Sequence, residues 1–220
     1  MPLNKPYPHI YRHGAVNSTM PYYEAWKSDV GINCLASYEI LKRDLKRLFE
    51  YIEPCQSNLS TFSHRTFELL IRACIEIEAL CKLVFAKNNV ILERSNIIRY
   101  SDLNSAMRLS DYEVLSYGFQ HPPFLPFQAF ANPVKKERSP IWYRAYNNVK
   151  HNRTDNFSDA SLENVIQAVG GVYVLLVAQF GLGFDHKIQL SFTGYLQDSP
   201  DFFRVKELPQ WSDDEQYQFG

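Results

Sequence analysis

The chain has 220 residues, of which 45% are hydrophobic and 15% aromatic, enough for one domain with a sizeable core. Its 23 basic and 24 acidic residues leave a formal net charge of -1, which excludes a generally basic nucleic-acid-binding protein but permits a local positive cleft. The cysteines, Cys34, Cys55, Cys74 and Cys81, show no paired CxxC spacing. We therefore predict reduced core thiols in a cytoplasmic protein, with no metal and no cofactor.

Residues 1–30 are predicted to form an extended arm, because they are rich in proline and lack the continuous apolar segment of a signal peptide. His9 and His13 are four residues apart, a spacing at which two histidines could share a metal ion. Pro8 and the lack of a third ligand nearby favour the other interpretation, an arm that lies on the surface or clasps a partner subunit.

A helical domain is predicted over residues 31–184, and it begins with two helices. Apolar residues recur at helical spacing from Ile32 to Ile52, with basic residues on the remaining surface, until Pro54 ends the run. The second helix, from about Ser63 to Lys87, is apolar nearly all round. Such a helix is typical of a buried position, so we expect it to be central.

Glu78 lies in the middle of an apolar stripe of the second helix. An ionised carboxylate at such a position needs a cation to offset its desolvation. Lys150 and Arg153 are the candidate partners, with the imidazole of His151 as a third. We predict a largely buried Glu78 in a structural ion pair, and favour this over a catalytic carboxylate.

An insertion is predicted at about residues 110–133. Alternating polarity around Tyr112, and a second run from Phe127 to Phe130, indicate a β-hairpin or a long ordered loop. Phe124 and these two phenylalanines could stack on nucleic-acid bases. Packing over the helices is the interpretation that we favour.

The last long helix is predicted to start at Leu162 and to end at Gly181. Its second half is apolar throughout, but it is shorter than a typical membrane span and contains Gln179, which favours a buried core helix over a membrane helix. Gly170 and Gly171 would let a neighbouring helix approach closely.

Residues 185–220 are predicted to form a C-terminal extension with two short strands, at Lys187–Thr193 and Phe203–Leu208. The complete pattern predicts a mainly α fold. Its core is an antiparallel bundle of four main helices, to which a small β-hairpin insertion and the short β-containing extension are added.

A further helix, before Leu162, concentrates the chemistry of the chain. Ser139 is its predicted N-cap, and Pro140 takes the first helical position. Its apolar face comprises Trp142, Ala145, Tyr146 and Val149. Its polar face comprises Arg144, Asn147, Asn148 and His151. An ordinary solvated face is one interpretation, but a guanidinium, amides and an imidazole without Glu or Lys suit a phosphate, since they can bind its oxygens, orient a nucleophile and transfer a proton.

The spacing on this polar face resembles the motif of HEPN domains, which are helical nucleotide-binding and ribonuclease modules. In that family four to six residues separate an Arg from a His, often with a polar residue directly after the Arg. Here six residues separate Arg144 from His151, and Asn147 lies four before the histidine. Ala145 follows the arginine, and Tyr146 holds the position five before the histidine where the family most often has its Arg.

The chain resembles a large set of uncharacterised HEPN-like proteins that carry a variant of this motif. The resemblance covers roughly residues 32–181. The shared residues are Trp142, Tyr146, Asn147, Lys150, His151 and Arg153. The resemblance implies a HEPN-like helical bundle and leaves two hypotheses about function.

The first hypothesis is a metal-independent endoribonuclease. In it, His151 transfers a proton at a ribose 2′-hydroxyl, Arg144 stabilises the charge of the phosphorane, and Asn147, supported by Asn148, positions the phosphate. The resemblance then implies a homodimer that brings two copies of the face together. The second hypothesis is a non-catalytic module that binds RNA, a nucleotide or an antitoxin-like protein partner, in which Lys150, His151 and Arg153 are structural.

Overall fold

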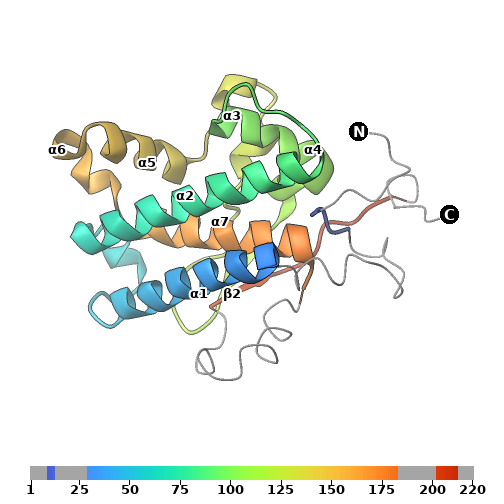
Figure 1. Ribbon diagram of the computed structural model, residues 1–220. Coiled ribbons are helices and arrows are strands. Elements are labelled where there is room, and N and C mark those ends of the chain that lie inside the picture. The colour runs from blue at the N-terminus through green and yellow to red at the C-terminus, as the bar shows by residue number, and fades with distance from the viewer. Residues whose placement is uncertain (1–8, 13–28, 183–201, 213–220) are drawn as a thin grey trace.

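Residues 9–12, 29–182 and 202–212 are described in the computed structural model, and their fold is mainly α, as predicted (Figure 1). The longer helices are α1 (Asp29–Phe49), α2 (His64–Lys87), α5 (Ile141–His151) and α7 (Leu162–Phe180). The shorter helices are α3 (Ile97–Tyr100), α4 (Asn104–Met107) and α6 (Arg153–Asn156). Within these described ranges the only sheet is the antiparallel pair of β1 (Val114–Ser116) and β2 (Phe203–Val205).

Helix α2 has well-defined signals at both ends. Its start is a capping box, in which the backbone N–H of Thr66 donates to the Ser63 hydroxyl at 3.1 Å and the backbone N–H of Ser63 donates to the Thr66 hydroxyl at 2.7 Å. At its end the side-chain amide of Asn88 donates to the carbonyl of Val84 at 2.8 Å. These caps satisfy backbone groups that a helix leaves unpaired, and they confirm the predicted limits of this helix.

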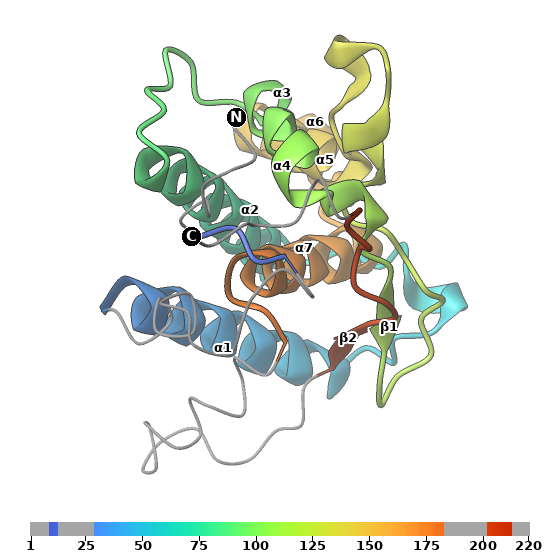
Figure 2. The ribbon, with the colours of Figure 1, turned by 90° about the vertical axis from the view of Figure 1, so that its right-hand side faces the viewer.

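The core forms around α7, which packs most extensively against α2 and also contacts α1, α5 and β2 (Figure 2). Length and composition alone would let Leu162–Phe180 cross a membrane, but 83% of the apolar window is buried inside the protein. A Cβ on Gly170 would lie 2.7 Å from the ring of Phe124, and one on Gly171 would lie 3.2 Å from the side chain of Ile77. The close approach at Gly170 is therefore made by a loop aromatic ring rather than by a helix.

Of the two forms predicted for the insertion at residues 110–133, the structure has the long ordered loop, and the β-hairpin is wrong. β1 pairs with β2 from the C-terminal extension, with Val114 opposite Val205. The only bridge from β1 back to the insertion joins Val114 to Phe124. Prolines lack the N–H that a sheet ladder needs, so the segment rich in them cannot supply the partner strand.

The aromatic side chains of the insertion pack in the core, which confirms the interpretation favoured over base stacking. Phe124, Phe127 and Phe130 are 7%, 0% and 1% exposed, and Gln128–Ala131 forms a 3₁₀ turn instead of the predicted strand. The strand predicted at Phe203–Leu208 is present as β2, whereas the one at Lys187–Thr193 lies outside the described residues.

The short described part of the N-terminal segment packs against the end of α7. His9 and Ile10 are buried, and the backbone N–H of Tyr11 donates to the carbonyl of Ala178 at 2.8 Å. The guanidinium of Arg12 lies 4.1 Å from the centre of the Trp211 ring, where it contacts the C-terminal extension. The prediction of a surface or partner-clasping arm is therefore wrong for residues 9–12, because Ile10 and the backbone of this segment contribute to the core; His13 lies outside the described residues.

Candidate functional site

Helix α5 begins one residue later than predicted. Pro140, not Ser139, is the cap, and its carbonyl accepts hydrogen bonds from the backbone N–H groups of Tyr143 and Arg144 at 3.1 and 3.0 Å. An extended Pro140 can take the cap position because its carbonyl, rather than its missing N–H, starts the helix. The two predicted faces of α5 keep their residues after this correction.

The apolar face of α5 is buried against the rest of the domain. Trp142, Ala145, Tyr146 and Val149 are all 5% exposed or less. The indole N–H of Trp142 donates to the carbonyl of Pro126 at 2.8 Å, which joins the helix to the loop that precedes it. Because one side of α5 is fixed in this way, the opposite side faces solvent.

The predicted catalytic residues lie on that open side. Arg144 and His151 are exposed, and Asn147 is partly exposed. None of the three side chains makes a hydrogen bond or an ion pair with any residue that the structure describes. Along the helix axis, Arg144 and His151 are about 10 Å apart, given a rise of about 1.5 Å per residue. Their donors and acceptors are therefore available to a ligand.

Asn148 differs from its neighbours on the polar face. Its side-chain amide donates to the Asp159 carboxylate at 2.8 Å, so it connects α5 to the turn before α7. Asp159 could not be identified from the sequence, because a surface aspartate eleven residues further on carries no periodic signal. The predicted supporting role of Asn148 thus includes a structural contact.

Glu78 does not pair with the residues predicted for it. Its side chain is 18% exposed, and Lys82, one turn further along α2, lies 3.5 Å from one of its oxygens. The hydroxyl of Tyr143 donates to the other oxygen at 2.8 Å. Lys150 instead donates to the hydroxyl of Tyr146 at 3.0 Å. The predicted ion pair with Lys150, Arg153 or His151 is wrong, because Tyr143 occupies the space between α5 and the carboxylate.

These contacts fix the charge states at the junction of α2 and α5. Burial and the hydrogen bond to Glu78 raise the pKa of Tyr143 well above its usual range, so this hydroxyl stays protonated and donates. The hydrogen bond to Tyr146 raises the pKa of Lys150, which stays a cation at the edge of the polar face. A cationic Lys150 next to His151 adds positive charge where an anionic ligand would bind.

Arg153 begins α6, two residues after the end of α5, and contacts an aromatic cluster. Its guanidinium carbon is 5.5 Å from the centre of the Phe67 ring. Phe157 lies at the middle of the cluster, with ring centres 5.5, 4.9 and 6.2 Å from those of Phe62, His64 and Phe67. Phe62 is 45% exposed, so part of this aromatic surface is open. The cluster could not be predicted from the sequence, because it joins the start of α2 to the segment after α6.

Metal and thiol chemistry find no support among the described residues. No group of three His, Cys, Asp or Glu side chains there is arranged to hold a metal ion. The four cysteines are free thiols; Cys74 and Cys81 are buried, and Cys34 and Cys55 are partly buried. Burial raises the pKa of Cys34 to about 11 and raises those of Cys74 and Cys81 as well, which makes these three poor nucleophiles.

No protein-family model, curated protein or solved structure matches the chain. The resemblance to HEPN domains therefore rests on the sequence motif in α5.

Proposed function

We propose that the chain is a HEPN-like protein in which α1, α2, α5 and α7 form the antiparallel bundle, and that the polar face of α5 is the site of a metal-independent endoribonuclease. One observation carries the proposal: Arg144, Asn147 and His151 share an exposed face on a helix anchored by its other side, and they form no hydrogen bond or ion pair with described residues. A structural Arg144 would need a local salt bridge, whereas the guanidinium is open to solvent.

Each side chain has a distinct part in cleavage. The imidazole of His151 accepts the proton of a ribose 2′-hydroxyl, and the 2′-oxygen forms a bond to the adjacent phosphorus. Arg144 binds the non-bridging oxygens as negative charge develops, and the Asn147 amide donates to the same phosphate. The bond from phosphorus to the 5′-oxygen breaks, and this oxygen takes the proton back from the His151 imidazolium. The products are a 2′,3′-cyclic phosphate and a 5′-hydroxyl.

A two-fold dimer completes this site. Residues 144 and 151 are equidistant from the midpoint between Asn147 and Asn148, so two α5 helices that cross antiparallel about a two-fold axis at that midpoint would place Arg144 beside His151 of the partner subunit. Such a dimer brings a guanidinium and an imidazole together at one phosphate. Ile141, which is 68% exposed on the same side of α5, supplies apolar surface for the contact. We place this homodimer in the cytoplasm, with no role in the membrane.

A non-catalytic module is the second candidate. Part of the motif has structural contacts, since Asn148 is bonded to Asp159 and Lys150 to Tyr146. Exposed aromatic rings near Arg153 suit the stacking of unpaired bases, which needs no catalysis. In this case the face binds RNA, a nucleotide or an antitoxin-like protein without cleaving anything.

Cleavage of single-stranded RNA in the presence of EDTA tests the proposal. The wild-type protein should produce cyclic or 3′-phosphate ends. Arg144→Lys should slow cleavage by about 100-fold, because an ammonium cannot reproduce the two-pronged contact of a guanidinium with phosphate oxygens. Arg94→Ala, which removes an exposed arginine from the loop after α2, is the matched control and should cleave at the wild-type rate. If RNA binds but is not cut by any preparation, the non-catalytic module is the better assignment.

A further inference from the structure

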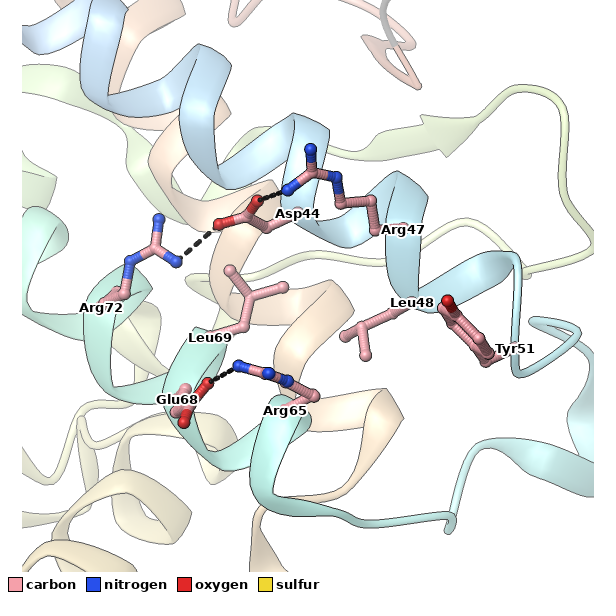
Figure 3. Close-up of a pocket in the computed structure, with 8 residues that line it drawn as sticks. All are labelled: Asp44, Arg47, Leu48, Tyr51, Arg65, Glu68, Leu69 and Arg72. Carbon is pink, nitrogen blue, oxygen red and sulfur yellow. Dashed lines mark hydrogen bonds and ion pairs between the residues drawn. The ribbon is translucent and has the colours of Figure 1, made fainter.

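A groove of about 350 Å³ lies between α1 and α2 (Figure 3). From α1 and the turn that follows it, the groove is lined by Asp44, Arg47, Leu48 and Tyr51. From α2, it is lined by Arg65, Glu68, Leu69 and Arg72. None of these residues belongs to the polar face of α5, so the groove is a separate feature of the molecule.

Positive charge exceeds negative charge on the walls of this groove. The carboxylate of Asp44 forms ion pairs with two guanidiniums, those of Arg72 at 2.6 Å and Arg47 at 3.7 Å. Glu68 pairs with Arg65 at 2.8 Å. Three guanidiniums thus face two carboxylates. Each guanidinium has five N–H donors, and these ion pairs occupy only some of them.

Stability alone does not explain the arrangement. Surface ion pairs contribute little to stability, and like charges gathered around one hollow repel one another. Arg47 and Arg65 have side chains that are 65% and 78% exposed, so neither is needed to fill the core. The arrangement instead holds the N–H donors of three guanidiniums around a single opening, where carboxylates keep them in position.

The floor and one end of the groove are apolar and aromatic. Leu48 and Leu69 form the floor, and they are 7% and 2% exposed. Tyr51 lies at one end in Figure 3 and is 86% exposed, the signature of a ring without a packing role. A flat ring of this kind offers a stacking surface beside the guanidiniums.

We propose that this groove binds a nucleotide, with its phosphate held by Arg47, Arg65 and Arg72 and its base stacked on Tyr51. Arginine forks match phosphate oxygens, and the leucine floor accepts the less polar part of the ligand. The volume lies at the lower end of the range for small-molecule sites, which suits a single nucleotide. The same chemistry occurs in a free nucleoside monophosphate and in the 5′-phosphorylated end of an RNA.

Titration calorimetry on the full chain tests this assignment. The probes are adenosine 5′-monophosphate, adenosine, inorganic phosphate, and 2′-O-methyl oligonucleotides with a 5′-phosphate or a 5′-hydroxyl, which cannot be cleaved by 2′-hydroxyl attack. The monophosphate should bind about tenfold more tightly than inorganic phosphate, because only the former can stack on Tyr51, and adenosine should bind least. Tighter binding of the 5′-phosphorylated oligonucleotide than of the monophosphate assigns the groove to RNA ends; the reverse order assigns it to free nucleotides.

Variants then place the ligand in the groove. Arg65→Ala and Arg47→Ala should each weaken binding of the monophosphate by about tenfold, whereas Arg94→Ala, the matched control, should leave it unchanged. Tyr51→Ala should weaken binding of the monophosphate but not of inorganic phosphate. The proposal is overturned if neither phosphorylated probe binds at about 10 mM, or if both arginine variants bind like wild type. Because no probe needs to be cut, the outcome is independent of whether α5 is catalytic.

Discussion

The two faces of α5 differ in how their polar atoms are used. On the buried face, the indole N–H of Trp142 and the hydroxyl of Tyr143 both have partners, Pro126 and Glu78. On the outer face, Arg144 and His151 are exposed and form no hydrogen bond or ion pair with a described residue. One helix therefore combines side chains that maintain the fold with side chains that the fold does not need. Side chains of the second kind are the ones available for chemistry.

Trp142→Ala should produce the largest loss of stability. It removes a side chain that is 1% exposed and a hydrogen bond to Pro126, and large-to-small changes of this kind cost about 3–5 kcal/mol. Arg144→Ala, two residues away on the outer face, should change the free energy of unfolding by less than about 0.5 kcal/mol. Urea denaturation of both variants measures the difference; similar losses would show that the two faces are not distinct.

Glu78 and Tyr143 test the boundary between the faces. Glu78→Ala leaves the buried hydroxyl of Tyr143 without an acceptor, which should cost about 1–3 kcal/mol. Tyr143→Phe removes the donor together with the need for the acceptor, so Glu78→Ala should cost much less in a Tyr143→Phe background. A double-mutant cycle measures this coupling. Equal costs of Glu78→Ala in both backgrounds would mean that the carboxylate is stabilised elsewhere.

The two asparagines give the smallest and most specific effect. Asn148→Ala breaks the hydrogen bond to Asp159 and should cost about 0.5–1.5 kcal/mol. Asn147→Ala breaks no hydrogen bond with a described residue and should leave the melting temperature unchanged while it slows RNA cleavage. Thermal denaturation and cleavage assays on the same samples separate the roles. A melting temperature that falls equally in both would remove the distinction between the two asparagines.

Local patterns in the sequence predicted most of the helices. The limits of α2 and α7 follow from serine caps and from apolar residues at helical spacing, which act over a few residues. The partner of β1 did not follow, because alternation indicates a strand but not the strand with which it pairs. Residues 9–12 were missed for a similar reason: their contact with the end of α7 joins segments far apart in the chain.

The site was predictable only where one helix defines it. Exposure of Arg144 and His151 follows from helical geometry, since both lie opposite Trp142. The partner of Glu78 depends on which side chain reaches it across two packed helices, and that choice cannot be read from spacing. The groove lined by Arg47 and Arg65 also needs the relative positions of α1 and α2, which no local pattern contains.

The most direct test of the proposed role of the outer face is the rate at which His151→Ala cleaves RNA in EDTA. The cleavage rate and the melting temperature of this variant are both measured beside those of the wild type. Removal of a general acid or base lowers a rate by about 10²–10⁴-fold, and we expect a loss of that size with no change in unfolding, since the side chain is exposed and unpaired among the described residues. A His151→Ala protein that cuts RNA as fast as wild type, or that unfolds at a lower temperature, would contradict a catalytic role for this face.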